Sequence, residues 1–236
     1  SGAPSVEGIN FKAMKGQTIG VIGGTGSGKS SLVNLIPRLY DATQGEVLVD
    51  GVNVKDYDIE ALRNKVGIVM QKAVLFKGTI RENMWMGKKG ATDEQIDEAL
   101  EISQSKEFVD SKQGRLDYVI EQGGKNLSGG QRQRLTIARA IVRKPDVLIL
   151  DDSASALDFA TDAALRKAIR GMNNSPTVFI VSQRAASLMY ADLIIVLDDG
   201  QVAGMGTHDE LLANCEVYKE IYESQFKKAD SEGGVA

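Results

Sequence analysis

Five short runs rich in Val, Ile and Leu stand out along the chain, and longer mixed or polar stretches separate them. The runs cover residues 18–22, 66–70, 147–151, 177–181 and 193–197. Nearly continuous apolar runs of this length are typical of strands that are buried on both faces, as in parallel sheets covered by helices. The hydrophobic pattern therefore predicts five core strands.

Helical patterns lie between these runs. Thr92 is followed by Gln95, the spacing of a capping box, and then by Ile96, Ala99 and Leu100 at helical spacing. Strands that alternate with helices are typical of the α/β class. We therefore predict an α/β fold with a mostly parallel sheet flanked by helices.

One stretch breaks this alternation. Residues from about 87 to 144 show helical patterns and no strong strand. We therefore predict a single domain over 1–236, in which a helical subdomain (87–144) is inserted between two parts of a core (9–86 and 145–222). The polar segment 224–236 ends in Glu-Gly-Gly-Val-Ala and is predicted to be a flexible tail.

Composition narrows the classes of function. The net charge is only −4, which disfavours nucleic acid as a partner. The single cysteine and the single histidine exclude an internal disulfide and leave too few ligands for a zinc or haem site. The apolar runs are far shorter than the roughly 20 residues that span a bilayer, so we expect any membrane link to come from a partner or from chain outside this sequence.

Residues 23–30 read Gly-Gly-Thr-Gly-Ser-Gly-Lys-Ser and lie between a predicted strand and a predicted helix. Glycines let the backbone approach phosphates and point its N–H groups at them. The lysine would reach the β- and γ-phosphates and the final serine hydroxyl would bind Mg²⁺. The predicted ATP-binding residues here are Gly23, Gly24, Thr25, Gly26, Ser27, Gly28, Lys29, Ser30 and Ser31.

A second candidate ligand ends the buried run 147–151. Asp151 would bind Mg²⁺, directly or through water, from the edge of the sheet where ligands of open α/β folds collect. The alternative is a carboxylate that only caps a turn.

Residues Leu127, Ser128, Gly129, Gly130 and Gln131 complete a set of motifs. Together with the glycine-rich loop 23–30 (the P-loop) and Asp151, they resemble the nucleotide-binding domain of an ABC transporter. The resemblance implies a P-loop NTPase fold. The resemblance runs from about residue 4 to residue 222. Within that family, residues 75–83 and Glu121 are similar to exporters of multidrug and peptide substrates.

The resemblance implies roles for two further segments. Gln71 matches the Q-loop glutamine and would join Ser30 and Asp151 around Mg²⁺, while residues 71–76 (the Q-loop segment) would contact a transmembrane domain. The segment Ser155-Ala156-Leu157-Asp158 matches the D-loop of the dimer interface.

The resemblance also implies a partner. Two ATPase domains would pair head to tail, and the signature 127–131 of this chain would cover ATP on the other domain. Physically, a serine and glycine N–H groups at a helix N-terminus form an anion site. We expect the assembly at the cytoplasmic face of the plasma (inner) membrane.

Two positions depart from the family pattern. Asp152 stands where the family has a glutamate general base, and a displacement of about 1 Å in a catalytic group can cost on the order of 100-fold in rate. Gln183 stands where the family has a histidine, and it cannot carry a positive charge toward the γ-phosphate. In the alternative, Asp152 serves as an adequate base through a backbone shift.

Both departures weaken the same site, while Lys29 and the signature are intact. The pattern resembles the degenerate half of a heterodimeric exporter, so we expect slow hydrolysis here and a non-identical partner that carries Glu and His at these positions.

Two other functions are alternatives. A soluble ABC ATPase of DNA repair shares the motifs but would need a coiled coil or a basic stripe, and neither is found in the sequence. An ATP-dependent dimerisation clamp with little hydrolysis is the second alternative.

Three smaller expectations complete the sequence analysis. In the family, an aromatic residue that stacks on adenine lies well upstream of the P-loop. We therefore expect that residue in a segment that precedes this sequence. Thr207 and Glu210 predict a capping box that gives His208 a plain role at a helix start. Lys112, Arg115 and Lys125 are interpreted as solvated surface charge.

Overall fold

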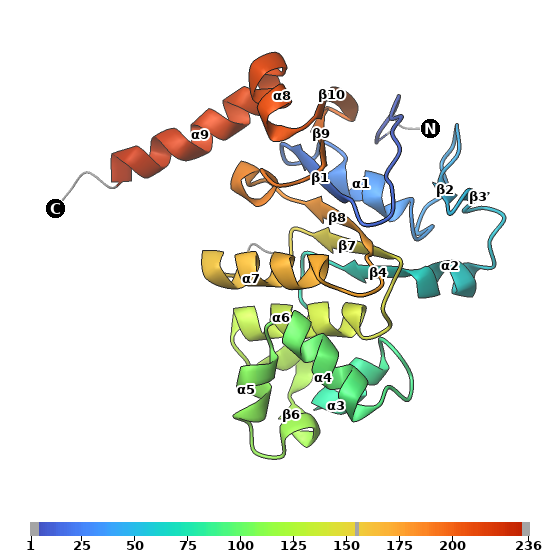
Figure 1. Ribbon diagram of the computed structural model, residues 1–236, viewed down its shortest axis with the longest axis vertical. Coiled ribbons are helices and arrows are strands. Elements are labelled where there is room, and N and C mark those ends of the chain that lie inside the picture. Colours follow the sequence, from blue (N-terminus) through green and yellow to red (C-terminus); the bar gives the residue numbers. More distant parts are fainter. Residues whose placement is uncertain (1–4, 154–155, 233–236) are drawn as a thin grey trace. The chain divides into compact units, whose positions relative to one another are not determined.

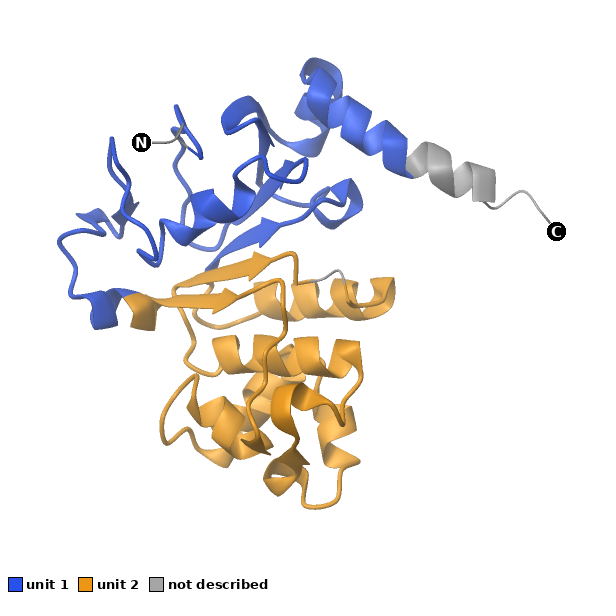
Figure 2. Cartoon of the chain, turned by 180° about the vertical axis from the view of Figure 1, so that it is seen from behind, with its two compact units in different colours: residues 1–62, 177–236 blue, residues 63–176 orange. Residues whose placement is uncertain are grey.

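A computed structural model describes residues 5–153 and 156–232 and shows an α/β fold (Figure 1). The chain forms two compact units, residues 1–62 with 177–236 and residues 63–176 (Figure 2). The first unit contains the P-loop, and the second contains the signature and the predicted helical subdomain. Each unit buries apolar strands under its own helices.

Three parallel strands and one antiparallel strand make the sheet of the first unit. Strand β1 lies between β8 and β9 and runs parallel to both, so that Val21 faces Val181 on one side and Ile195 on the other. Strand β10 pairs with β9 in the antiparallel sense. The bounds are β1 (Thr18–Gly23), β8 (Thr177–Val181), β9 (Leu193–Asp198) and β10 (Gln201–Gly206).

Short strands and helices complete the first unit, and α2 continues into the second. The two-residue strands β2 and β3 pair with each other as a hairpin. Helix α9 packs on β9, β10 and α8 and against the short helix η3. The bounds are α1 (Lys29–Asn34), β2 (Leu48–Val49), β3 (Val52–Asn53), α2 (Ile59–Lys65), η3 (Ala185–Ser187), α8 (His208–Asn214) and α9 (Glu216–Glu232).

The second unit joins a parallel strand pair to a helical region. Strands β4 and β7 are parallel, with Val69 opposite Leu150, and the short strands β5 and β6 are antiparallel. The bounds are β4 (Val66–Val69), β5 (Gly78–Thr79), α3 (Ile80–Trp85), α4 (Asp93–Ile102), α5 (Lys106–Asp110), η1 (Arg115–Asp117), β6 (Val119–Ile120), η2 (Gln122–Gly124), α6 (Gly129–Ile141), β7 (Val147–Asp151) and α7 (Phe159–Arg170).

Helix α6 organises the core of the second unit. It packs against α3, α4 and β4, and Leu135, Ile137 and Ala138 on it are fully buried. Ile96 and Leu100 of α4 are also fully buried. Truncation of such a side chain to alanine typically costs about 2–5 kcal/mol, so the helix that carries the signature is rigidly supported.

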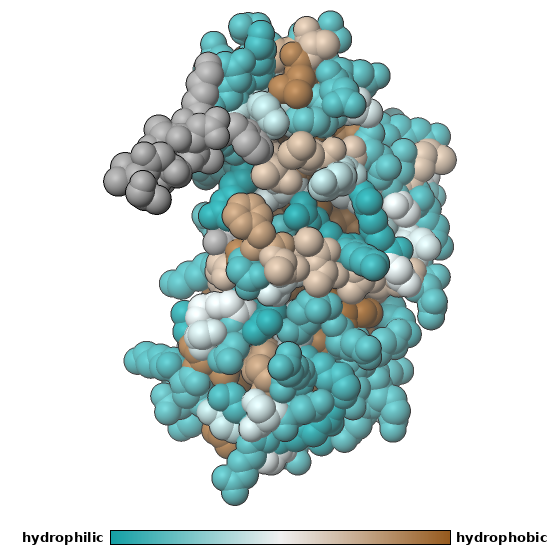
Figure 3. All heavy atoms as spheres, turned by 60° about the vertical axis from the view of Figure 1, so that its left-hand side comes forward, coloured by the Kyte–Doolittle hydropathy of each residue, from teal (hydrophilic) through white to brown (hydrophobic). Residues whose placement is uncertain are grey.

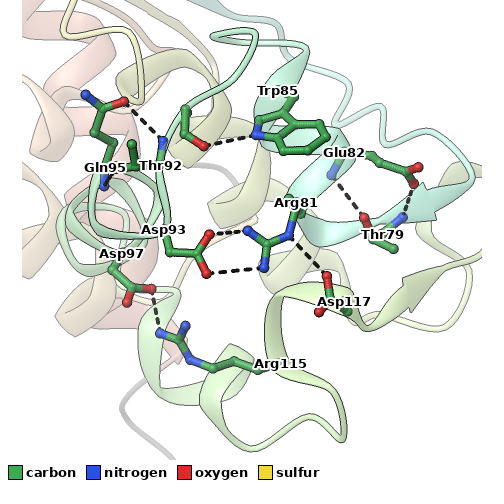
Figure 4. Close-up of polar contacts among 11 residues, drawn as sticks. Thr79, Arg81, Glu82, Trp85, Thr92, Asp93, Gln95, Asp97, Arg115 and Asp117 are labelled. Atoms are coloured by element: carbon green, nitrogen blue, oxygen red, sulfur yellow. Dashed lines mark hydrogen bonds and ion pairs between the residues drawn. The ribbon is translucent and has the colours of Figure 1, made fainter.

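Ion pairs connect the helices that flank α6 (Figure 4). Arg81 of α3 makes a two-pronged contact with Asp93 at the start of α4 and a contact of 3.1 Å with Asp117 of η1. Arg115 of η1 pairs with Asp97 of α4. Arg115, interpreted as solvated surface charge, is 35% exposed, and two acidic side chains from other helices pair with it.

The pattern of apolar runs located the strands well. All five predicted strands are present within one residue of the predicted bounds, and the Thr92 capping box is confirmed. The capping box at Thr207 is also confirmed, and His208 is the first residue of α8. The Nδ1 atom of His208 lies 2.8 Å from the hydroxyl of Tyr218, whose pKa burial raises to about 12, so that hydroxyl is neutral and can donate.

The segment predicted to be a flexible tail overlaps the last helix. Helix α9 continues through Ser224 to Glu232. Most residues from 225 to 232 are polar, but Gln, Lys and Ala have high helix propensity and no Gly or Pro interrupts them before residue 233. Low hydrophobicity therefore does not exclude a helix in this segment.

Polar residues predominate on the face shown in Figure 3, and apolar residues form smaller groups between them. Among the described residues, no helix is both long and apolar enough to cross a bilayer.

Candidate functional site

The P-loop connects β1 to α1 in the first unit. Gly26 and Gly28 have φ of 84° and 91°, in the left-handed region that favours glycine. Gly28 is the N-cap of α1, whose first residue is Lys29. The sequence prediction of a strand, a glycine-rich turn and a helix is thus confirmed, and the loop presents the N-terminus of α1.

The side chain of Lys29 is held inside this loop. Its ammonium donates to the carbonyl oxygens of Gly23 at 2.9 Å and Gly24 at 2.6 Å, and it lies 3.4 Å from Oγ of Ser27. The residue is only 9% exposed. The loop therefore concentrates one positive charge where its backbone turns, which is the arrangement that phosphate binding requires.

Gly28 is a glycine of the loop at which a side chain would not fit. A Cβ there would lie 2.4 Å from Cγ1 of Val6 and 2.6 Å from the carbonyl oxygen of Ser5, whereas a Cβ on Gly24 would meet nothing within 4 Å. We expect Gly28→Ala to lower the thermal unfolding temperature and to weaken ATP binding, since the left-handed conformation alone costs about 1–2 kcal/mol for alanine.

Gly24→Ala is the matched control for stability, because it lies in the same loop and its φ is not positive. Gly24 is itself a predicted ATP-binding residue, so the comparison of the two variants is made on the unfolding temperature. Unfolding followed by circular dichroism and ATP binding followed by calorimetry measure both effects. Equal unfolding temperatures of the two variants would contradict the packing described at Gly28.

Gln183 lies at the carboxyl end of β8, and the P-loop follows the carboxyl end of β1. Since β1 and β8 are parallel neighbours, both segments leave the same edge of the sheet. Gln183 is exposed, and its backbone carbonyl accepts a hydrogen bond of 2.7 Å from Nε2 of Gln225. The first unit thus places Gln183 and the P-loop on one edge of the sheet.

Asp151 and Gln71 occupy the corresponding edge in the second unit. Asp151 ends β7 and is 4% exposed. Gln71 follows the end of β4, the parallel partner of β7, and is exposed. The fold therefore brings two of the three predicted Mg²⁺ ligands to one edge of a strand pair.

Asp152 is tied directly to Gln71. Its Oδ2 accepts a hydrogen bond of 3.0 Å from Nε2 of Gln71. Its backbone has φ of 45°, in the left-handed region, where aspartate is among the few residue types that are tolerated. The short carboxylate is thus both unusual in backbone conformation and engaged by the Q-loop glutamine.

The signature forms the N-terminus of α6. Ser128 is the N-cap, its Oγ accepts from the backbone N–H of Gln131 at 3.2 Å, and the side chain of Gln131 accepts from the N–H of Ser128 at 3.1 Å. Gly129 and Gly130 are the first two residues of the helix. Their N–H groups lie in the first turn, which has no intrahelical acceptors, and they are available to an anion.

Arg139 connects the signature helix to the Q-loop segment. Its Nη2 donates to the carbonyl oxygen of Val74 at 2.9 Å, and its guanidinium lies 5.9 Å from the ring centre of Phe76. Burial lowers the pKa of Arg139, although an arginine stays charged at neutral pH. Sequence reasoning did not identify this contact, because nothing local marks which arginine of α6 faces the Q-loop segment.

The D-loop is described in part. Ser155 lies outside the described residues. Leu157 is buried, and Asp158 is the N-cap of α7, with its Oδ1 accepting from the N–H of Thr161 at 2.9 Å. That hydrogen bond and the Thr161 hydroxyl lower the pKa of Asp158. Asp158 therefore has a local structural role besides the predicted one at an interface.

The predicted magnesium ligands are a hydroxyl (Ser30), an amide oxygen (Gln71) and a carboxylate (Asp151). This set of hard oxygen donors suits Mg²⁺, which is usually bound by one or two carboxylates together with phosphates and water. Within residues 5–153 and 156–232, no group of three or more His, Cys, Asp or Glu forms a metal cluster. The donor set thus fits a nucleotide-bound Mg²⁺ better than a metal held by the protein alone.

Comparison with known proteins agrees with these features. The family profile described as "ABC transporter" matches residues 6–155. The uncharacterized ABC transporter ATP-binding protein YfiB of Bacillus subtilis is 45% identical over 224 residues, which are 95% of this chain and 39% of that protein. A Staphylococcus aureus protein is named for a proposed role as a multidrug export ATP-binding/permease protein. It is 40% identical over 223 residues, which are 94% of this chain and 39% of that protein.

A solved structure is similar over nearly the whole chain. The structure of a bacterial Atm1-family ABC exporter with ATP bound superposes with a TM-score of 0.89 at 32% identity, covering 94% of this chain and 39% of that one. This chain therefore spans about 40% of the length of these relatives. The matched profile, the identities and the shared fold show that the chain belongs to the ABC transporter family and has the fold of its P-loop ATPase domain.

Proposed function

We propose that this chain is the ATP-binding and hydrolysing domain that powers an ABC exporter, and that its own ATP site binds nucleotide firmly but hydrolyses it slowly. The observation that carries the second part is the pair formed by Asp152 and Gln71, joined at 3.0 Å. The residue at the position of the general base has a short side chain, and one of its oxygens is already engaged.

The chain's own residues divide the chemistry between them. Lys29 and the P-loop N–H groups bind the β- and γ-phosphates, and Asp152 orients the attacking water. Gln183 donates a neutral hydrogen bond to the γ-phosphate. Each of the last two groups stabilises the transition state less well than the longer carboxylate or the charged imidazole of the family pattern.

Magnesium would be held by Ser30 and Asp151, with the amide oxygen of Gln71, and would neutralise the charge of the phosphates. The amide nitrogen of Gln71 donates to Asp152, so its oxygen would be the atom left to bind the metal. One residue thus links the candidate ligand set to the candidate base.

The signature serves a second ATPase domain. Ser128, Gly129 and Gly130 offer an anion site at the start of α6, and we assign it to ATP bound on the partner's P-loop. The partner is a non-identical chain with Glu and His at the positions of Asp152 and Gln183. The D-loop, including Leu157 and Asp158, lines the same interface.

A transmembrane domain is the third partner. In the second unit Val74, Phe76 and Met86 are 43%, 47% and 51% exposed, so they offer apolar surface to a partner. Arg139 holds the Q-loop segment through a hydrogen bond to the carbonyl oxygen of Val74. We assign these exposed side chains to contact with membrane-spanning chain at the cytoplasmic face of the plasma membrane, in accord with the export function that names the Staphylococcus aureus relative.

ATP-dependent pairing with the partner domain tests this function. We expect ATP with Mg²⁺ to bring this chain and its partner together in sedimentation experiments, and Ser128→Arg to abolish pairing by filling the anion site with a cation. Ser224→Ala is the control, because that exposed residue lies on α9. Pairing that does not depend on ATP would contradict the proposal, and pairing without any turnover at either site would favour a dimerisation clamp.

A further inference from the structure

The segment that follows β8 is fixed by a hydrogen bond from a distant part of the chain. In this switch loop (residues 182–185), the N–H of Ser182 donates to the carbonyl oxygen of Val21 in β1 at 3.1 Å. The hydroxyl of Ser182 accepts from the N–H of Arg184 at 2.9 Å. These contacts fix the start of the loop, but they leave the peptide groups of Gln183 and Ala185 to other partners.

Gln225 of α9 supplies those partners. Its Nε2 donates to the carbonyl oxygen of Gln183 at 2.7 Å, and its Oε1 accepts from the N–H of Ala185 at 2.9 Å. The orientation of the amide follows from chemistry, since a backbone carbonyl can only accept and a backbone N–H can only donate. One planar side chain therefore bridges two peptide groups on either side of Arg184.

Glutamine is suited to this bridge. It combines a donor and an acceptor in one rigid plane, whereas glutamate lacks the donor and leucine lacks both. The two bonds together fix the position and the tilt of the loop backbone. The exposed side chain of Gln183 starts from this fixed backbone.

We propose that Gln225 is a positioning residue for hydrolysis, which aims the side chain of Gln183 by holding the backbone of the switch loop. This inference rests on the proposed role of Gln183 at the γ-phosphate. It also gives α9 a part in the ATP site, because any movement of that helix moves the bridge.

The bridge is separate from the contacts that fold α9. Tyr218, two turns earlier on the helix, is fully buried and lies 2.8 Å from Nδ1 of His208, and α9 also packs on β9, β10 and α8. Removal of the Gln225 amide should therefore leave the helix docked. Ser224, its neighbour, is exposed and donates to the carbonyl oxygen of Ile221 within the helix, which makes it a matched control.

Hydrogen exchange tests the bridge without reference to activity. We expect Gln225→Leu to speed exchange of the Ala185 amide at least tenfold, and Ser224→Ala to leave it unchanged. Gln225→Glu keeps the acceptor and should retain part of the protection. Unchanged exchange in Gln225→Leu would overturn the bridge.

Kinetics in the assembled transporter test the positioning. We expect Gln225→Leu to slow single-turnover hydrolysis at this chain's P-loop about tenfold, which corresponds to the free energy of one hydrogen bond. The Kd for ATP should change less than twofold. In a Gln183→Ala background the same substitution should have no further effect. An equal effect in both backgrounds would overturn positioning through Gln183.

Different results would contradict the positioning role of Gln225 and the proposed role of Gln183. If Gln183→Ala alone left hydrolysis unchanged, the role of Gln183 at the γ-phosphate would be wrong, and with it the positioning role. The exchange rate of Ala185 would still report whether the bridge exists.

Discussion

The double variant Asp152→Glu, Gln183→His is expected to hydrolyse ATP at this chain's P-loop on the order of 100-fold faster than the wild type. Glutamate extends the carboxylate by one methylene toward the attacking water, and histidine adds a group that can carry positive charge toward the γ-phosphate. Trapped-nucleotide measurements on the assembled transporter, which report hydrolysis at each site separately, give the rates.

The backbone of position 152 adds a cost that the experiment must separate. Its φ of 45° suits aspartate better than glutamate, so we expect the variant to lose up to about 1 kcal/mol of stability. Thermal unfolding measures that loss. Asp152→Asn, which keeps the shape of the side chain and removes its charge, should lower the rate further. A double variant that folds but hydrolyses no faster would contradict the assignment of a weakened site.

Lys29→Ala is expected to weaken ATP binding to this chain by about 10- to 100-fold, since a hydrogen bond to a charged group contributes about 1.5–3 kcal/mol. The ammonium of Lys29 is the positive charge that the loop holds through Gly23 and Gly24. Isothermal titration with Mg-ATP gives the dissociation constant.

Lys125→Ala is the charge-matched control, because Lys125 is exposed and lies in the second unit. Circular dichroism shows whether Lys29→Ala still folds, which matters because the side chain bonds to its own loop. If the folded Lys29→Ala protein bound Mg-ATP as tightly as the wild type, the P-loop assignment would be wrong.

The sequence was most informative where structure is local. The apolar runs predicted β1, β4, β7, β8 and β9, because a strand buried on both faces has no polar positions to obscure it. Strand β10 was missed, since Gln201–Gly206 contains two glycines and alternates exposed and half-buried positions before Gly206. The predicted tail overlaps α9, because a mostly polar sequence can still have high helix propensity.

The candidate site shows the same difference between local features and long-range contacts. Motif spacing identified the P-loop, Asp151 and the signature, whose local geometry follows from a turn, a strand end and a helix cap. It did not identify the contacts of Gln71 with Asp152 or of Gln225 with Gln183, which join residues 81 and 42 positions apart. Such pairs depend on tertiary packing, and no local pattern of a single sequence encodes them.

The state of the nucleotide on this chain after one turnover tests the central claim most directly. The assembled transporter would be loaded with a photoreactive, radiolabelled ATP, allowed a single turnover and crosslinked, so that the nucleotide on each chain can be analysed. We predict ADP on the partner's P-loop and mostly uncleaved ATP on this chain's P-loop. Equal conversion to ADP on both chains at the same rate would contradict the account.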